Sequence, residues 1–142
     1  MEFTKRFVAG SLFRNGHEAD MMVVHCSDFR FLEQHQQLIS RGLPAGTKDL
    51  IAVPGSIGLY LRRAPVPGRE APVALLIEKH KPKAVIFVGH HDCAYYGGDD
   101  NAVKRDLLQA KVEMEREYPN LQVVAYFAGI KDDVLVEFIR YD

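Results

Sequence analysis

The sequence lacks tryptophan, has only two cysteines among 142 residues, and contains no long apolar run. Two cysteines are too few for a disulfide framework, and such thiols more often bind a metal or do chemistry in a reducing compartment. No stretch reaches the ~18 apolar residues of a membrane-spanning helix, and residues 1–10 lack the apolar core of a secretory signal. We therefore expect a soluble, cytoplasmic protein.

An excess of charge of one sign is also missing. The chain has 18 Lys and Arg against 19 Asp and Glu, for a net charge of -1, and these residues are interspersed. Nucleic acids and acidic membranes require a basic surface, so neither is an expected partner. The length predicts a single domain spanning residues 1–142, with the Pro- and Gly-rich segment 65–72 as a surface loop rather than a linker.

Short apolar runs alternate with helical patterns along the chain. The runs from Met21 to Cys26 and from Ala84 to Val88 are typical of strands buried on both faces of a parallel sheet. The segment 50–53 is expected to be another buried strand, and 121–127 a further strand. After a turn at 129–133, the strand 134–139 is expected to pair antiparallel, because this connection is too short for a parallel crossover. Helices are expected at 31–41, 71–80 and 101–118.

This alternation predicts an α/β fold in one domain. The expected architecture is a mostly parallel central sheet with flanking helices and an antiparallel edge strand. In such folds, ligands usually bind outside the carboxyl ends of the strands. Residues that follow the strands are therefore the first candidates for a functional site.

Three residues with metal-binding side chains stand at these positions. Cys26 ends the first strand, and His90 and Cys93 follow the strand 84–88. If the two strands are neighbours, the three side chains converge. Zn²⁺ favours thiolate and imidazole ligands in tetrahedral geometry, and three protein ligands leave a fourth position for water or a carboxylate. The alternative is that both cysteines are small buried hydrophobic residues.

The loop after Cys26 carries a carboxylate and a guanidinium, Asp28 and Arg30, which are close enough in sequence to form a bidentate pair. As an ordinary surface ion pair they would contribute ~0–1 kcal/mol. Beside a zinc ion, Asp28 could instead accept a hydrogen bond from metal-bound hydroxide, or bind the metal itself. Arg30 would decide between these two by holding Asp28 away from the metal.

Together, the two motifs resemble the paired signature of the β-class carbonic anhydrases. The first half, Cys-x-Asp-x-Arg, corresponds to 26–30, and the second, Gly-His-x-x-Cys, to 89–93. The likeness extends from about Met21 to Phe138. It implies zinc-dependent reversible hydration of carbon dioxide to bicarbonate by a zinc-bound hydroxide, on an α/β fold that forms a homodimer or a higher homo-oligomer. The residues that it implies are the zinc ligands Cys26, His90 and Cys93 and a gating and orienting dyad, Asp28 and Arg30.

One segment departs from the family pattern. Members typically have Arg-Asn-Ala-Gly-Asn after the second strand, whereas this chain has Pro54-Gly55-Ser56-Ile57-Gly58, which alters the polar wall of the pocket. A second hypothesis is therefore a zinc-binding relative that does not hydrate carbon dioxide, or that hydrolyses a related molecule such as carbon disulfide. A third is a purely structural zinc module with Asp28 as the fourth ligand.

Two further histidines flank the expected ligands. Adjacent residues on a strand point to opposite faces, so His25 and His91 are not expected to bind the metal. Because histidine titrates near neutral pH, proton transfer by His91 stays open as an alternative.

The segment from His25 to Arg30 superficially resembles the phosphate loop of cysteine phosphatases. That loop, however, has five residues between Cys and Arg, whereas this chain has three, and the acidic Asp28 would repel an anion.

Overall fold

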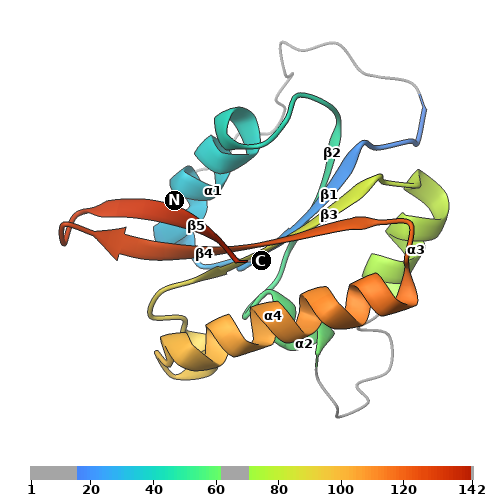
Figure 1. The fold of residues 1–142 in the computed structure, drawn as a ribbon. Helices are drawn as coiled ribbons and strands as arrows, with labels where there is room; N and C mark the ends of the chain where they lie inside the picture. The colour runs from blue at the N-terminus through green and yellow to red at the C-terminus, as the bar shows by residue number, and fades with distance from the viewer. Residues whose placement is uncertain (1–15, 62–70, 142) are drawn as a thin grey trace, which may run out of the picture.

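The computed structural model describes residues 16–61 and 71–141. Residues 1–15 and most of the expected loop at 65–72 lie outside this description. The centre of the structure is a five-stranded sheet with the strand order β2-β1-β3-β4-β5 (Figure 1). Its strands are β1 (Met21–His25), β2 (Lys48–Ala52), β3 (Ala84–His90), β4 (Gln122–Lys131) and β5 (Leu135–Tyr141).

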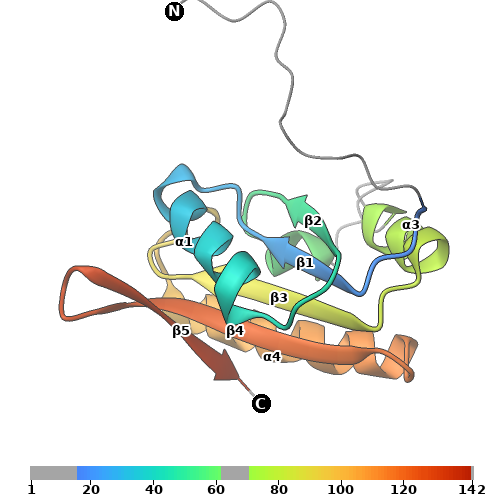
Figure 2. The ribbon, with the colours of Figure 1, turned by 90° about the horizontal axis from the view of Figure 1, so that it is seen from above.

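The sheet is mixed. Strands β2, β1, β3 and β4 run parallel to one another, and β5 pairs antiparallel with β4 at the edge. This confirms the predicted α/β fold with an antiparallel edge strand. Helices cover both faces, with α1 opposite α4 (Figure 2). The helices are α1 (Leu32–Gln37), α2 (Ile57–Tyr60), α3 (Ala71–His80) and α4 (Asp100–Glu117).

Helix α4 packs along the sheet and reaches the end of β3. It begins where Asp99 Oδ1 accepts hydrogen bonds from the amides of Asn101 and Ala102, which would otherwise lack partners. Gly89 of β3 lets the helix approach closely, because a Cβ there would lie 2.5 Å from Val103 Cγ1. The helix buries an apolar stripe that consists of Val103, Leu107, Ala110 and Met114.

Three details differ from the sequence-based expectations. Strand β2 is an edge strand rather than a buried one, and Leu50 within it is 53% exposed. Strand β4 runs through Gly129, so the turn before β5 is formed later, by Asp132 and Asp133 with φ of 51° and 57°. The expected helix at 31–41 is shorter in its α-helical part, with a 3-10 turn before it and a π turn after it.

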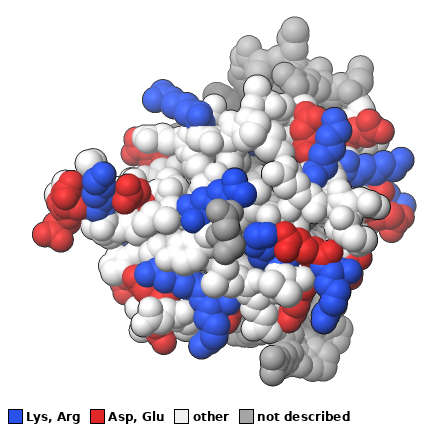
Figure 3. Space-filling model, in the orientation of Figure 1, with Lys and Arg blue, Asp and Glu red and all other residues white. Residues whose placement is uncertain are grey.

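Basic and acidic side chains are mixed over the face of the molecule shown in Figure 3. This arrangement agrees with their near-equal numbers in the sequence. No helix in the described part of the chain is long and apolar enough to cross a membrane.

A buried histidine lies between α1 and the sheet. His35 is 1% exposed, and neither of its ring nitrogens has a hydrogen-bond partner among the described residues. Its ring packs against His25, at 4.6 Å between centroids, and against Phe31, at 6.2 Å. Burial, assisted by the neighbouring histidines, lowers the pKa of His35 to about 4. The folded protein therefore holds this ring in its neutral form.

We expect His35→Leu to stabilise the protein and to reduce the pH dependence of its stability. The unfolded chain binds a proton at His35 below about pH 6.5, but the folded protein does so only below about pH 4. The free energy of unfolding is therefore unaffected by His35 above pH 6.5. It decreases as the pH falls, by about 2 kcal/mol at pH 5. Removing two buried, unpaired nitrogens should add about 1–3 kcal/mol at pH 7.5.

Urea unfolding at pH 7.5 and pH 5 would measure both effects. His17→Gln, at an exposed position, is the matched control and should keep the pH dependence of the parent. An equal loss of stability on acidification in the parent and in His35→Leu would show that His35 is not responsible.

Candidate metal centre

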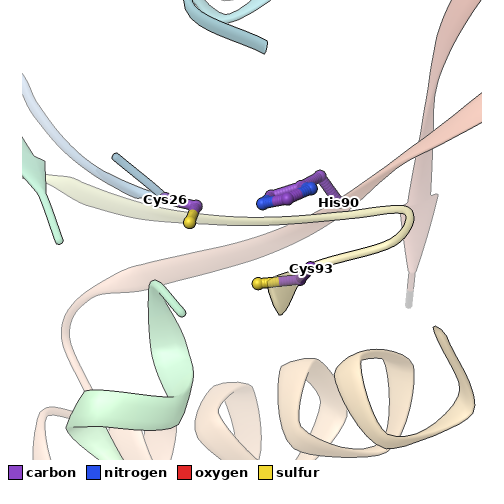
Figure 4. A group of neighbouring side chains, drawn as sticks. All are labelled: Cys26, His90 and Cys93. Carbon is purple, nitrogen blue, oxygen red and sulfur yellow. The ribbon is translucent and has the colours of Figure 1, made fainter. Parts of the chain in front are cut away.

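The pairing of β1 with β3 brings the three expected ligands together. His25, the last residue of β1, lies opposite Val88 of β3, so Cys26 comes close to the end of β3, where His90 stands. Cys93 lies in the turn that follows. The ligand atoms of Cys26, His90 and Cys93 all lie within 4.8 Å of one another, and all three residues are buried. Figure 4 shows their side chains pointing toward a common space.

The ring of His90 is oriented with one nitrogen toward that space. Its Nδ1 lies 2.7 Å from the carbonyl oxygen of His91, which is the arrangement of an N–H donor and its acceptor. Nε2 is buried and makes no hydrogen bond within the described residues. A buried nitrogen without a partner is costly, and a metal ion would satisfy its lone pair. This atom therefore fits a metal ligand.

The two thiols shift each other's pKa in opposite directions. A hydrogen bond with Cys93 is the largest cause that lowers the pKa of Cys26. The His90 ring and the Gly55 amide, 3.3 Å from Cys26 Sγ, lower it further, while burial opposes these effects. The same bond, together with burial, raises the pKa of Cys93. Cys26 is therefore the more acidic of the two thiols. A divalent cation would stabilise both sulfurs as thiolates.

Asp28 and Arg30 form the bidentate pair expected from the sequence. Arg30 Nη2 donates to Asp28 Oδ2 at 2.7 Å, and Nε lies 3.1 Å from both carboxylate oxygens. These bonds lower the pKa of Asp28 to about 2. Asp28 Oδ2 lies 3.9 Å from His90 Nε2, which places the carboxylate beside the ligand cluster. It is therefore a charged acceptor next to the candidate metal position.

Sequence reasoning missed a second carboxylate, Asp92. It contacts the same guanidinium through Arg30 Nη1, at 2.9 Å from Asp92 Oδ2. Its place between His90 and Cys93 in the sequence was the only signal, since an acidic residue there is next to two expected ligands.

The two flanking histidines point elsewhere. His91 Nδ1 lies 2.7 Å from Asp100 Oδ2 at the start of α4, and His25 Nδ1 lies 2.8 Å from the carbonyl oxygen of Cys26. Neither ring belongs to the cluster of ligand atoms.

A cavity of about 580 Å³ opens beside Cys26 and Cys93. The segment that departs from the family pattern forms one wall through Pro54 and Gly55, against Tyr95. Gly55 has a φ of 73°, and a Cβ there would lie 2.3 Å from the Tyr95 ring. Glycine is therefore required both for the backbone conformation and for the close approach of the ring. This wall consists of backbone, proline and an aromatic face.

Comparison with known proteins identifies the family. A family model described as "Putative carbonic anhydrase" matches residues 17–140. The chain belongs to this family. Among curated proteins, an uncharacterized protein of Rickettsia conorii is 25% identical over 138 residues, which cover 87% of this chain and 73% of that protein.

Solved structures of β-carbonic anhydrases share the fold. The β-carbonic anhydrase CcaA superposes with a TM-score of 0.59 at 16% identity, covering 90% of this chain and 81% of that chain. The carbonic anhydrase from Glaciozyma antarctica gives a TM-score of 0.56 at 15% identity, covering 92% and 86%. The predicted resemblance to the β-class carbonic anhydrases is confirmed at the level of the fold.

Proposed function

We propose that this protein catalyses the reversible hydration of carbon dioxide to bicarbonate with a zinc ion held by Cys26, His90 and Cys93. The observation that supports this best is a buried cluster of two sulfurs and an imidazole nitrogen, all within 4.8 Å of one another. In the described part of the chain, this nitrogen has no hydrogen-bond partner. Thiolate and imidazole are the ligands that zinc prefers. Bound by three protein ligands, zinc supplies a Lewis acid that lowers the pKa of water to ~7.

Asp28 and Arg30 are the proposed catalytic dyad. Because Arg30 keeps the pKa of Asp28 at about 2, the carboxylate is an acceptor and not a proton donor at neutral pH. In this proposal, Asp28 accepts a hydrogen bond from the attacking nucleophile and so orients its lone pair toward the substrate. Arg30 fixes the carboxylate through charge-assisted hydrogen bonds. The wall formed by Pro54 and Tyr95 offers apolar contacts that suit a small neutral substrate.

Stopped-flow measurement of carbon dioxide hydration tests this function. Zinc-loaded protein should exceed the uncatalysed rate, with a rate that rises with pH. Chelation should abolish the activity, and added zinc should restore it. If the zinc-loaded protein shows no hydration from acid to alkaline pH, a zinc-binding relative that does not hydrate carbon dioxide, or that hydrolyses a molecule such as carbon disulfide, becomes the better proposal. The altered wall at 54–58 would then be the expected reason.

The homodimer implied by the family resemblance is also a proposal. Sedimentation at assay concentrations should give twice the mass of one chain, and an active monomer would contradict it.

A further inference from the structure

The guanidinium of Arg30 is occupied on two edges. Its Nε and Nη2 edge faces Asp28, and its Nη1 and Nη2 edge faces Asp92. On the second edge, Nη1 donates to Asp92 Oδ2 at 2.9 Å, and Nη2 donates to the main-chain carbonyl oxygen of Asp92 at 2.8 Å. Arginine is suited to such paired bonds because its donors lie in one rigid plane.

The two partners of Arg30 belong to different loops. Asp28 and Arg30 both follow β1. The bonds between these two residues do not fix their position relative to the residues that follow β3. Asp92 lies between His90 and Cys93 in the chain and therefore ties the pair to the segment that carries both candidate ligands. The Asp92 side chain is 58% exposed, so its charge alone would contribute little. Its effect comes from fixing the orientation of the guanidinium plane.

The backbone of Asp92 is itself held in place. Its amide donates to Asp100 Oδ1 at 3.0 Å, and Asp100 is the first residue of the 18-residue helix α4. The other oxygen of Asp100 pairs with His91. Asp92 has a φ of 50°, a left-handed conformation that Asp and Asn adopt more readily than most residues. Asp92 is thus anchored to a long helix.

We propose that Asp92 is a positioning residue of this site, which holds the second edge of Arg30 and so keeps Asp28 beside the metal position without letting it become a ligand. Only the catalytic purpose of this arrangement rests on the proposed function. The restraint of Arg30 by Asp92 can be measured in a protein without activity.

Two variants isolate the Asp92 carboxylate. Asp92→Gly removes it and still accepts the left-handed backbone, whereas Asp92→Asn keeps an oxygen acceptor without the charge. Asp132→Gly is the matched control, because Asp132 is exposed and has a nearly identical φ of 51° in the turn between β4 and β5. Arg30→Ala serves as the reference in which Asp28 is fully released.

The first measurement is solvent exchange of the Arg30 Nη1–H group that donates to Asp92 Oδ2, followed by ¹⁵N nuclear magnetic resonance in metal-free protein. Exchange should be about tenfold faster in Asp92→Gly, as expected for the loss of one charge-assisted hydrogen bond. It should increase less in Asp92→Asn and stay unchanged in Asp132→Gly. Equal exchange in Asp92→Gly and the parent would overturn the proposal.

The second measurement is the visible absorption spectrum of the protein loaded with Co²⁺ in place of zinc. The spectrum of Asp92→Gly should move from that of the parent toward that of Arg30→Ala, and Asp132→Gly should match the parent. A spectrum of Asp92→Gly that coincides with the parent, while Arg30→Ala differs, would overturn the positioning role. If the zinc-loaded parent does not hydrate carbon dioxide but the exchange and spectral series hold, Asp92 keeps this role and the proposed function is rejected.

Discussion

Cys93→Ser is expected to remove stoichiometric zinc and with it a large part of the stability of the zinc-loaded protein. A serine hydroxyl stays protonated at neutral pH and is a poor substitute for a thiolate. Changes to residues that merely support a ligand cost 10–100-fold in metal affinity, so loss of a ligand should cost more than about 100-fold. Because zinc binds the folded state, the lost affinity appears directly as lost stability.

Zinc content by elemental analysis and thermal unfolding with and without chelator would measure this. The parent and Cys93→Ser should differ strongly with zinc and only slightly after chelation, since the two side chains are similar in size. If Cys93 were only a small buried hydrophobic residue, the difference in stability would be the same in both conditions. Full zinc content in Cys93→Ser would show that the ligand assignment is wrong.

Arg30→Ala is expected to abolish carbon dioxide hydration while leaving zinc bound. The substitution removes the guanidinium donors that hold Asp28 and lets the pKa of Asp28 rise from about 2 toward its usual value. That value is still far below neutral pH, so Asp28 stays charged. What changes is its position: a free carboxylate beside a zinc ion can bind it and fill the fourth coordination position. We expect a loss of at least about 100-fold in kcat/KM, as for other preorganised polar groups at active sites.

Asp28→Ala separates this gating role from a general loss of structure. It should leave a weakly active protein, because it removes the orientation of the nucleophile but leaves the metal position open. The double variant Asp28→Ala with Arg30→Ala should be no less active than Asp28→Ala alone, so that removing Asp28 rescues Arg30→Ala. Stopped-flow rates and zinc content for the parent, both single variants and the double variant make this comparison. Equal hydration rates in the parent and Arg30→Ala would refute the dyad.

The sequence predicted the elements well where one physical signal dominates. The strand from Met21 to His25 lies in the middle of the sheet, and its continuous apolar run reflects burial on both faces. The helix from Asp100 to Glu117 has a clear apolar period and a capping aspartate. By contrast, the run at 50–53 is equally apolar but belongs to an exposed edge strand. A short apolar run does not show whether a strand lies at the centre or at the edge of a sheet.

The candidate site divides in the same way. Residue type and spacing alone singled out Cys26, His90 and Cys93, because thiolates and imidazole at the ends of strands are chemically distinctive. Local spacing also predicted the pair of Asp28 and Arg30, which are two residues apart.

Only the tertiary structure decided which residues of distant segments come into contact at the site. The pairing of β1 with β3 brings Cys26 to His90, and the turn after β3 delivers Asp92 to the free edge of Arg30 across 62 residues of sequence. The same packing encloses His35, and residues 16–61 and 71–141 supply no hydrogen-bond partner for its ring nitrogens. The sequence determined which groups were available, since their chemistry is intrinsic to each side chain. Strand order and loop geometry decided which of them meet, since contacts between distant segments depend on the free energy of the whole fold.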